Sequence, residues 1–258
     1  MKRSREDVSA VAEKKVKREE SPKTSSKTPP KTPPKALRAT TIRQRTERAS
    51  AVIHYSGEGT LSLTPHAHVI VFDGLSPELA QKVLLELRDL SFESPLIRTP
   101  RGDRVPIPRG QCAIGDGNYR YGGMTVVPQP WTTTPFLAQA RALLEERLDQ
   151  KFSYALINRY MDGKQVVGWH SDDERDLEPG QSIVSLSLGA TRKFRVRAKQ
   201  ARDKDTGERA PVHEFHAGHN VVIVMAGKHF QRDFVHTVPR ESRVKDVRFN
   251  VTFRTLKQ

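Results

Sequence analysis

The chain of 258 residues contains a single cysteine, Cys112, and no long run of apolar residues. One cysteine excludes an intramolecular disulfide framework and a zinc site built on cysteines, so we expect a reducing compartment. A membrane-spanning helix needs roughly 20 apolar residues, and no stretch approaches that length. The charged start of the chain also lacks the apolar segment of a secretory signal. We therefore expect neither a membrane protein nor a secreted scaffold.

Aromatic residues are absent from residues 1–50, which instead carry most of the excess positive charge. This segment holds 15 Lys and Arg against 6 Asp and Glu, whereas the remaining 208 residues hold 29 against 24. A segment rich in Lys, Ser, Thr and Pro cannot bury enough surface to offset the entropy lost on ordering. We predict a disordered basic tail over residues 1–50 and one folded domain over residues 51–258.

A short basic run in this tail, Lys14-Lys15-Val16-Lys17-Arg18, resembles a nuclear import signal. Short basic runs also occur in tails that serve only to stay solvated, so the pattern is weak. A polycationic arm attracts phosphate backbones whatever their sequence. We expect the protein in the nucleus, with the cytoplasm as a second location.

Two helices are predicted in the first half of the folded domain. Ser76-Pro77 and Thr134-Pro135 each combine a capping residue with a proline at the first helical position. Leucine and valine then recur at helical spacing. The segment between the helices, residues 97–125, has five arginines among glycines, prolines and tyrosines. It is too polar for a core and too long for an ordinary connection, so we predict a functional loop.

After residue 152 the hydrophobic pattern changes to that of short strands. The segments are separated by turn signals and contain no helical pattern. Such a series indicates a mainly β fold with flanking helices, an α+β protein whose core is a jelly roll. We read seven strands in the segments 154–160, 183–188, 193–197, 212–215, 220–225, 234–238 and 247–255.

The strongest chemical signal is the run Trp169-His170-Ser171-Asp172-Asp173-Glu174. His170 and Asp172 are two residues apart, so in an extended segment both side chains point the same way. A second histidine would complete the two-histidine, one-carboxylate set that binds non-haem Fe(II) with open positions. His236, within a predicted strand, is the best candidate. A His-x-Asp pair alone is also common in solvated turns, and we take Trp169 and Cys112 as structural.

The C-terminal strand strengthens this interpretation. Residues 248–254 alternate strictly, with Arg248, Asn250, Thr252 and Arg254 on one face and apolar residues on the other. The two arginines stand about 20 Å apart at the backbone, and their long side chains leave room for a short dicarboxylate between them. In an ordinary β-sandwich this polar face would simply be exposed to water.

Taken together, these motifs resemble the AlkB family of Fe(II)- and 2-oxoglutarate-dependent nucleic-acid dealkylases. The resemblance covers roughly residues 65–258, and the runs 170–174 and 187–192 resemble those of the eukaryotic AlkB homologues 2 and 3. It implies a double-stranded β-helix, the name used in this family for a jelly roll. It also implies that Fe(II), 2-oxoglutarate and O2 take part in the reaction.

The resemblance assigns a role to each site residue. Iron would be held by His170, Asp172 and His236. Arg248, helped by Tyr160, would bind the far carboxylate of 2-oxoglutarate, and the rest of that pocket would be lined by Asn158, Asn250, Thr252 and Arg254, the last also counted as catalytic. The substrate would be bound by Tyr119, Tyr121, Gly122, Glu174 and Arg109. Among these, Tyr121 would stack on the flipped base, Glu174 would read its exocyclic amine and Arg109 would grip phosphate.

The implied reaction is oxidative removal of alkyl groups from bases such as 1-methyladenine and 3-methylcytosine, in DNA and in RNA. It would release succinate, CO2 and an aldehyde as a direct reversal of damage. An alkylated base pairs poorly, so flipping it out of a duplex costs less than flipping a normal base. We expect a monomer. Two alternatives stay open: an oxygenase of the same kind acting on protein or lipid, and a non-catalytic reader of modified nucleic acid.

One departure from the family concerns residues 99–103, at the start of the predicted loop. Homologue 2 has an apolar wedge there that fills the gap left in a duplex. The corresponding residues here, Thr99-Pro100-Arg101-Gly102-Asp103, include no bulky apolar side chain. We therefore expect a preference for single strands.

Overall fold

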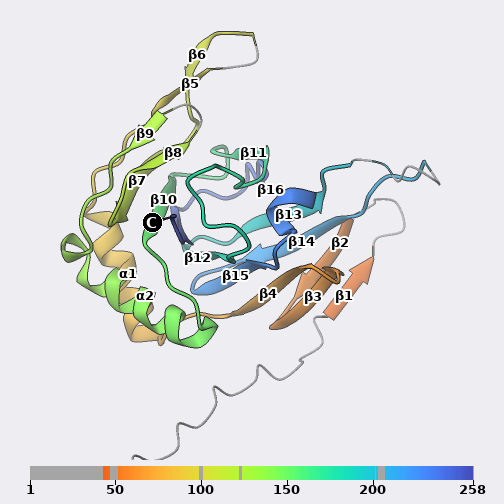
Figure 1. Ribbon diagram of the computed structural model, residues 1–258, viewed down its shortest axis with the longest axis horizontal. Helices are drawn as coiled ribbons and strands as arrows, with labels where there is room; N and C mark the ends of the chain where they lie inside the picture. The colour runs from red at the N-terminus through yellow and green to blue at the C-terminus, as the bar shows by residue number, and fades with distance from the viewer. Residues whose placement is uncertain are drawn as a thin grey trace, which may run out of the picture. The chain divides into compact units, whose positions relative to one another are not determined.

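The computed structural model of the chain describes residues 43–46, 52–98, 101–121, 124–200, 202 and 207–257 (Figure 1). Most of the predicted basic tail, with its import-like run, lies outside these residues. The described part is mainly β, and two large sheets form a jelly roll, as predicted. None of the helices among the described residues is long and apolar enough to cross a membrane.

The first sheet has six strands in the order β1-β2-β14-β13-β16-β11. All neighbours pair antiparallel except β2 and β14, which are parallel. Its strands are β1 (Arg43–Thr46), β2 (Val52–Ser56), β11 (Val167–His170), β13 (Arg192–Ala198), β14 (Val212–Ala217) and β16 (Phe234–Val238). β1 comes from the segment predicted as tail.

The second sheet has seven antiparallel strands in the order β3-β4-β15-β12-β17-β10-β7. Its strands are β3 (Gly59–Thr64), β4 (Ala67–Asp73), β7 (Gly110–Gly115), β10 (Tyr154–Tyr160), β12 (Ile183–Gly189), β15 (Val221–Ala226) and β17 (Arg248–Arg254). β12 and β17 are inner strands with almost every residue buried, because both faces of this sheet are covered.

Two helices, α1 (Pro77–Arg88) and α2 (Pro135–Leu148), pack together outside the seven-stranded sheet (Figure 1). Ser76 caps α1 as predicted, since its hydroxyl accepts a hydrogen bond from the Leu79 amide. Thr134 provides no such side-chain cap to α2. The Glu86 carboxylate of α1 accepts from the amides of Phe136 and Leu137 instead. A short 3-10 helix, Trp131–Thr133, precedes α2, and a one-turn helix, α3 (Phe230–Asp233), precedes β16.

Two separate apolar layers hold these elements together. One lies between α1, α2 and the outer face of the seven-stranded sheet. The other lies between the two sheets and includes Phe194, Phe215 and Met225. Where β10, β12 and β17 face β11 and β16, the side chains between the sheets are largely polar. The cavity described below lies there.

The predicted functional loop, residues 97–125, is largely strand. It contributes the hairpin β5 (Leu96–Arg98) and β6 (Arg104–Pro106), the edge strand β7, and the hairpin β8 (Tyr119–Tyr121) and β9 (Met124–Val126). The first hairpin extends away from the sheets (Figure 1). The reading as loop was wrong because these strands are short and are separated by glycines and prolines, so none of them shows the long apolar alternation of a core strand.

Candidate active site

The three predicted iron ligands come together between the sheets. His170 ends β11, Asp172 follows it, and His236 lies in the middle of β16 opposite His170. One ligand atom from each residue lies within 4.8 Å of the others. The Nε2 atom of His170 is 3.6 Å from Oδ1 of Asp172, and the two imidazole centroids are 4.1 Å apart.

Hydrogen bonds and packing orient these side chains. Nδ1 of His170 lies 2.9 Å from the carbonyl oxygen of Gly168, which can only accept, so Nδ1 carries the proton and Nε2 keeps a free lone pair. The His236 ring stacks on Phe194 at 5.4 Å between centroids. Burial lowers the pKa of His236 to about 3, so this imidazole is neutral at physiological pH and can bind a metal.

Asp172 and Arg254 form a buried ion pair at the centre of the site. Nη2 of Arg254 donates to Oδ2 of Asp172 at 2.8 Å, and both side chains are almost fully buried. Burial alone would raise the pKa of Asp172, but Arg254 and the two imidazoles outweigh it and hold that pKa well below its usual range. Asp172 is therefore a carboxylate at any physiological pH.

A cavity extends from the three ligands along β10 and β17. Its walls carry the polar face of the C-terminal strand, as the alternation predicted. Asn250 accepts from Nη2 of Arg248 at 2.6 Å and from the Ser185 hydroxyl at 2.9 Å, and its own amide donates to Thr252 at 2.9 Å. Arg248 also donates to the Ser187 hydroxyl at 2.8 Å.

Tyr160 is a further partner of Arg248. The Cζ atom of the guanidinium lies 5.3 Å from the centre of the Tyr160 ring, and Tyr160 raises the pKa of Arg248, which favours its charged form. Burial lowers the pKa of Arg248 to about 10, so the group keeps its positive charge at physiological pH. The structure thus places a fixed, buried cation beyond Asn250 on the strand that carries Arg254 at its other end.

Several polar atoms around the cavity have no hydrogen-bond partner among the described residues. They are Oδ1 of Asp172, Nη1 of Arg248, and Nε and Nη1 of Arg254. Buried polar groups are normally paired, so unpaired ones at a cavity indicate a missing ligand. An oxygen acceptor beside two imidazoles fits a divalent metal, and free guanidinium donors fit carboxylates. The residues present therefore fit both iron and 2-oxoglutarate.

Arg109 lies in this cavity and not on a phosphate-binding surface. The side chain is 5 % exposed, and its Nε atom donates to Oδ1 of Asn158 at 2.7 Å. Gln111 donates to the same oxygen at 2.9 Å. The role predicted for Arg109, binding phosphate on a surface loop, does not agree with this position. The prediction failed because Arg109 lies directly before β7, and the pairing of β7 with β10 turns both Arg109 and Gln111 inward.

The other predicted substrate residues differ in their positions. Glu174 is half-buried and lines a cleft of about 830 Å³ that shares Asp172 and Arg254 with the site. Tyr119 is fully buried, with its ring 5.0 Å from that of Tyr154 and its side chain beside Glu174. It thus presents no exposed stacking face. The Tyr121 side chain and Gly122 lie outside the described residues.

Two serines belong to the site although the sequence analysis passed over them. Ser185 and Ser187 lie two residues apart in the otherwise apolar strand β12, and both hydroxyls bond to groups of the cavity wall. The signal was available, because two polar residues at alternate positions of a buried strand share one face. They orient Asn250 and Arg248.

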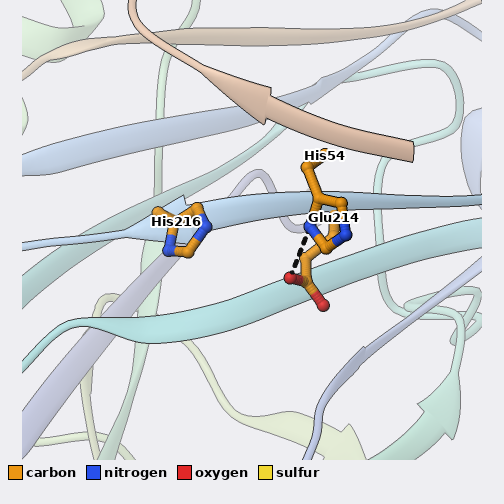
Figure 2. A group of neighbouring side chains, drawn as sticks. All are labelled: His54, Glu214 and His216. Carbon is orange, nitrogen blue, oxygen red and sulfur yellow. Dashed lines mark ion pairs between the residues drawn. The ribbon is translucent and has the colours of Figure 1, made fainter. Parts of the chain in front are cut away.

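A second group of possible metal ligands lies on the outer face of the six-stranded sheet. It consists of His54 on β2 with Glu214 and His216 on β14 (Figure 2). Glu214 accepts from Arg195 at 2.6 Å and lies 2.9 Å from Nδ1 of His54 and 3.3 Å from Nζ of Lys193. Two cations already surround this carboxylate, so a divalent metal would meet repulsion. We interpret the group as an ion-pair cluster.

Comparison with known proteins agrees with this geometry. Residues 68–254 match the sequence model of the 2OG-Fe(II) oxygenase superfamily. The chain is 36% identical to mouse DNA oxidative demethylase ALKBH2 over 152 residues, which is 58% of this chain and 62% of that protein. The human ALKBH2 protein has the same identity over 57% of its length.

A second group of relatives is equally similar. Mouse alpha-ketoglutarate-dependent dioxygenase alkB homolog 3 is 36% identical over 154 residues, 58% of this chain and 52% of that protein. The chain thus spans about half to six-tenths of the length of the curated relatives it matches. A solved structure, that of OsALKBH1, aligns with 76% of the chain at 19% identity and a TM-score of 0.47.

Proposed function

Because the chain belongs to the 2OG-Fe(II) oxygenase superfamily, we propose that it is an Fe(II)- and 2-oxoglutarate-dependent dioxygenase that removes alkyl groups from nucleobases. The observation that carries this proposal is the unpaired oxygen of Asp172, which faces two imidazoles at one end of a cavity lined by buried arginines. The names of the ALKBH2 and alkB homolog 3 relatives support alkylated DNA as the substrate.

His170, Asp172 and His236 would hold the iron, and Arg248 with Tyr160 would hold the far carboxylate of 2-oxoglutarate. When bound, Fe(II) with 2-oxoglutarate and O2 would supply the oxidation of the N-alkyl carbon, and the alkyl group would leave as an aldehyde. Arg254 neutralises Asp172 and directs its remaining donors into the cavity. The surrounding apolar layer excludes water, which strengthens these electrostatic contacts.

Glu174 would accept a hydrogen bond from the exocyclic amine of the damaged base. It lines the cleft beside the ligands and lies next to Tyr119. Bases alkylated at N1 of adenine or N3 of cytosine carry positive charge, so an acidic group favours them over normal bases. We include RNA as a second substrate class.

The test is turnover of single-stranded and duplex DNA and of RNA, each carrying one 1-methyladenine or 3-methylcytosine, with Fe(II), 2-oxoglutarate and ascorbate. Wild type should remove the methyl group, whereas His170→Ala and Arg248→Ala should not. Iron content should be one per chain in wild type and in His54→Ala, and should be lost in His170→Ala. If 2-oxoglutarate binds but no nucleic acid is demethylated, the substrate is of another class, protein or lipid.

The alternative of a non-catalytic reader of modified nucleic acid must also be distinguished from the enzyme. It would bind methylated oligonucleotides without producing succinate. Succinate release that depends on methylated nucleic acid would exclude it, and binding without release would replace the proposed enzyme by a reader.

We also propose a nuclear location and a monomeric state. The location rests on the basic run at residues 14–18. Replacing Lys14, Lys15, Lys17 and Arg18 by alanine in a fluorescent fusion should shift the protein out of the nucleus. Light scattering during gel filtration should give a mass near 29.1 kDa. An unchanged nuclear signal or a doubled mass would contradict these two proposals.

A further inference from the structure

Trp169 is an exposed aromatic residue directly beside an iron ligand. Its side chain is 39 % exposed, whereas the other tryptophan, Trp131, is buried beneath the guanidinium of Arg141. Large aromatic side chains are normally buried because their apolar surface is costly in water. Trp169 precedes His170 in β11, so folding of the core does not explain its exposure.

Arg197 on β13 holds the Trp169 ring. Its Cζ atom lies 4.7 Å from the ring centre, and the guanidinium reaches across β16 to meet the ring. Nε of Arg197 is buried without a hydrogen-bond partner, and the guanidinium forms no ion pair within the described part of the chain. Its charge is therefore available to an incoming anion.

A hollow of about 880 Å³ opens at this pair. Trp169, Arg197, Arg202 and Arg209 line it together with three small or apolar residues, and its described lining includes no acidic side chain. Asp173, four residues after Trp169, is paired with Lys199 at 2.9 Å. The hollow thus combines an aromatic face with three guanidinium groups.

β11 is the last strand of the six-stranded sheet, which determines how this hollow relates to the site. His170 points into the cavity, and Trp169, the preceding residue of the strand, points to the outer face of the sheet. No further strand among those described lies beyond β11. A nucleotide strand could therefore place one base in the cavity and its neighbour on Trp169 by passing around this edge.

We propose that Trp169 and the three arginines bind the nucleotide next to the reacting one, with its base stacked on the free face of Trp169 and its phosphates held by Arg197, Arg202 and Arg209. This rests on the proposed function and deepens it. Nucleic acid is the ligand that presents flat rings and anions at regular spacing, and aromatic faces interleaved with cations are how proteins bind single strands. The site would favour substrates longer than one nucleotide.

Tryptophan fluorescence tests this directly. In Trp131→Phe, Trp169 is the only tryptophan left, and a single-stranded methylated heptamer should quench its emission, with Mn(II) and 2-oxoglutarate present so that no turnover occurs. A methylated mononucleotide should not quench it. The difference in emission between wild type and Trp169→Phe gives the same signal without altering Trp131.

Kinetics supply a second readout. Trp169→Ala should raise the KM for the heptamer roughly tenfold, the order of one lost base stack. The kcat, the KM for a mononucleotide and the affinity for 2-oxoglutarate should stay as in wild type, and Trp169→Phe should recover part of the loss. Arg209→Ala should reduce the salt dependence of binding by about one ion. Arg88→Ala changes an exposed arginine of α1 on the other side of the molecule. It should leave the salt dependence of binding unchanged.

The outcomes separate the two proposals. Absence of quenching, or equal effects of Trp169→Ala on heptamer and mononucleotide, would overturn the Trp169 proposal and leave the enzyme intact. Equal quenching by polyglutamate would also overturn it, because charge alone would then explain binding. Quenching by the heptamer without demethylation would support the nucleotide site and overturn the enzymatic function.

Discussion

At the scale of single residues, the charge of Asp172 organises the site. Its carboxylate faces two imidazoles on one side and the Arg254 guanidinium on the other. Removing one member of a buried, hydrogen-bonded ion pair leaves an unpaired charge, which costs more than the pair itself contributes. The structure therefore ties metal binding to the co-substrate pocket through one side chain.

Arg109 gives the first prediction. It and Gln111 both donate to Oδ1 of Asn158, and the Asn158 side chain lines the cavity. Arg109→Gln should weaken 2-oxoglutarate binding roughly tenfold, the cost of a lost charge-assisted hydrogen bond, and Arg109→Lys should weaken it less. Calorimetry with the Mn(II)-loaded protein measures this.

The control for Arg109 is the affinity for a single-stranded oligonucleotide, measured by fluorescence anisotropy. It should not change in either variant, because Arg109 is buried. Arg101→Ala, at the exposed tip of the β5–β6 hairpin, should weaken oligonucleotide binding and leave 2-oxoglutarate binding unchanged. Loss of oligonucleotide binding with normal 2-oxoglutarate binding in Arg109→Gln would restore the phosphate role.

His213 gives a prediction about pH. Its Nδ1 atom lies 2.9 Å from the Tyr55 hydroxyl, and burial lowers its pKa from 6.5 to about 4. The unfolded chain therefore takes up a proton first as the pH falls below 6.5, and stability is lost until the pH reaches about 4. When the pH falls from 7 to 5, this residue should lower the free energy of unfolding by about 2 kcal/mol.

Urea unfolding of wild type and His213→Gln at the two pH values measures the effect. The variant should lose about 2 kcal/mol less between them. Equal losses would mean that His213 is not the group responsible.

At the scale of elements, strands carry the chemistry and helices support them. β10, β12 and β17 each have one face in the cavity, while α1 and α2 cover the far face of the same sheet. The link between the helices is itself polar, because Glu86 of α1 caps the first turn of α2.

This cap can be tested by Glu86→Ala. The substitution should lower the free energy of unfolding by about 1 kcal/mol, as for other lost helix caps, and should leave 2-oxoglutarate binding unchanged. Glu78→Ala is the matched control on α1, since its exposed carboxylate pairs with Lys82 on the helix surface. An equally small effect of both substitutions on urea unfolding would argue against the cap.

At the scale of the whole molecule, the β5–β6 hairpin extends away from the sheets, and Arg101, Gly102 and Asp103 are exposed at its tip. A wedge that replaces a flipped base in a duplex needs an apolar side chain, because it substitutes for base stacking. A charged tip cannot do this, so single strands should be the better substrates.

Arg101→Phe should raise the demethylation rate on duplex DNA by roughly an order of magnitude, because unstacking costs a few kcal/mol, and should leave the rate on single strands unchanged. Arg101→Gln is the control for loss of charge alone. A wild-type enzyme that already prefers duplexes would show that another part of the molecule fills the gap.

The sequence by itself determined seven of the eight described strands after residue 152, the two helices and the group His170, Asp172 and His236. It did not predict β11 or the strands before residue 152. Periodicity, capping residues and spacing along one strand are local properties, so these elements could be predicted without the fold. The polar alternation of residues 248–254 likewise predicted which side chains share a face, although not that both faces are buried.

Only the tertiary structure decided the places of Arg109, Tyr119 and Trp169. Each depends on which strand lies opposite and which face is turned inward. β7 pairs with β10, and this turns Arg109 into the cavity, while the position of β11 at the sheet edge leaves Trp169 exposed. Pairing partners far apart in the sequence are set by the packing of the whole chain, and no local pattern encodes them.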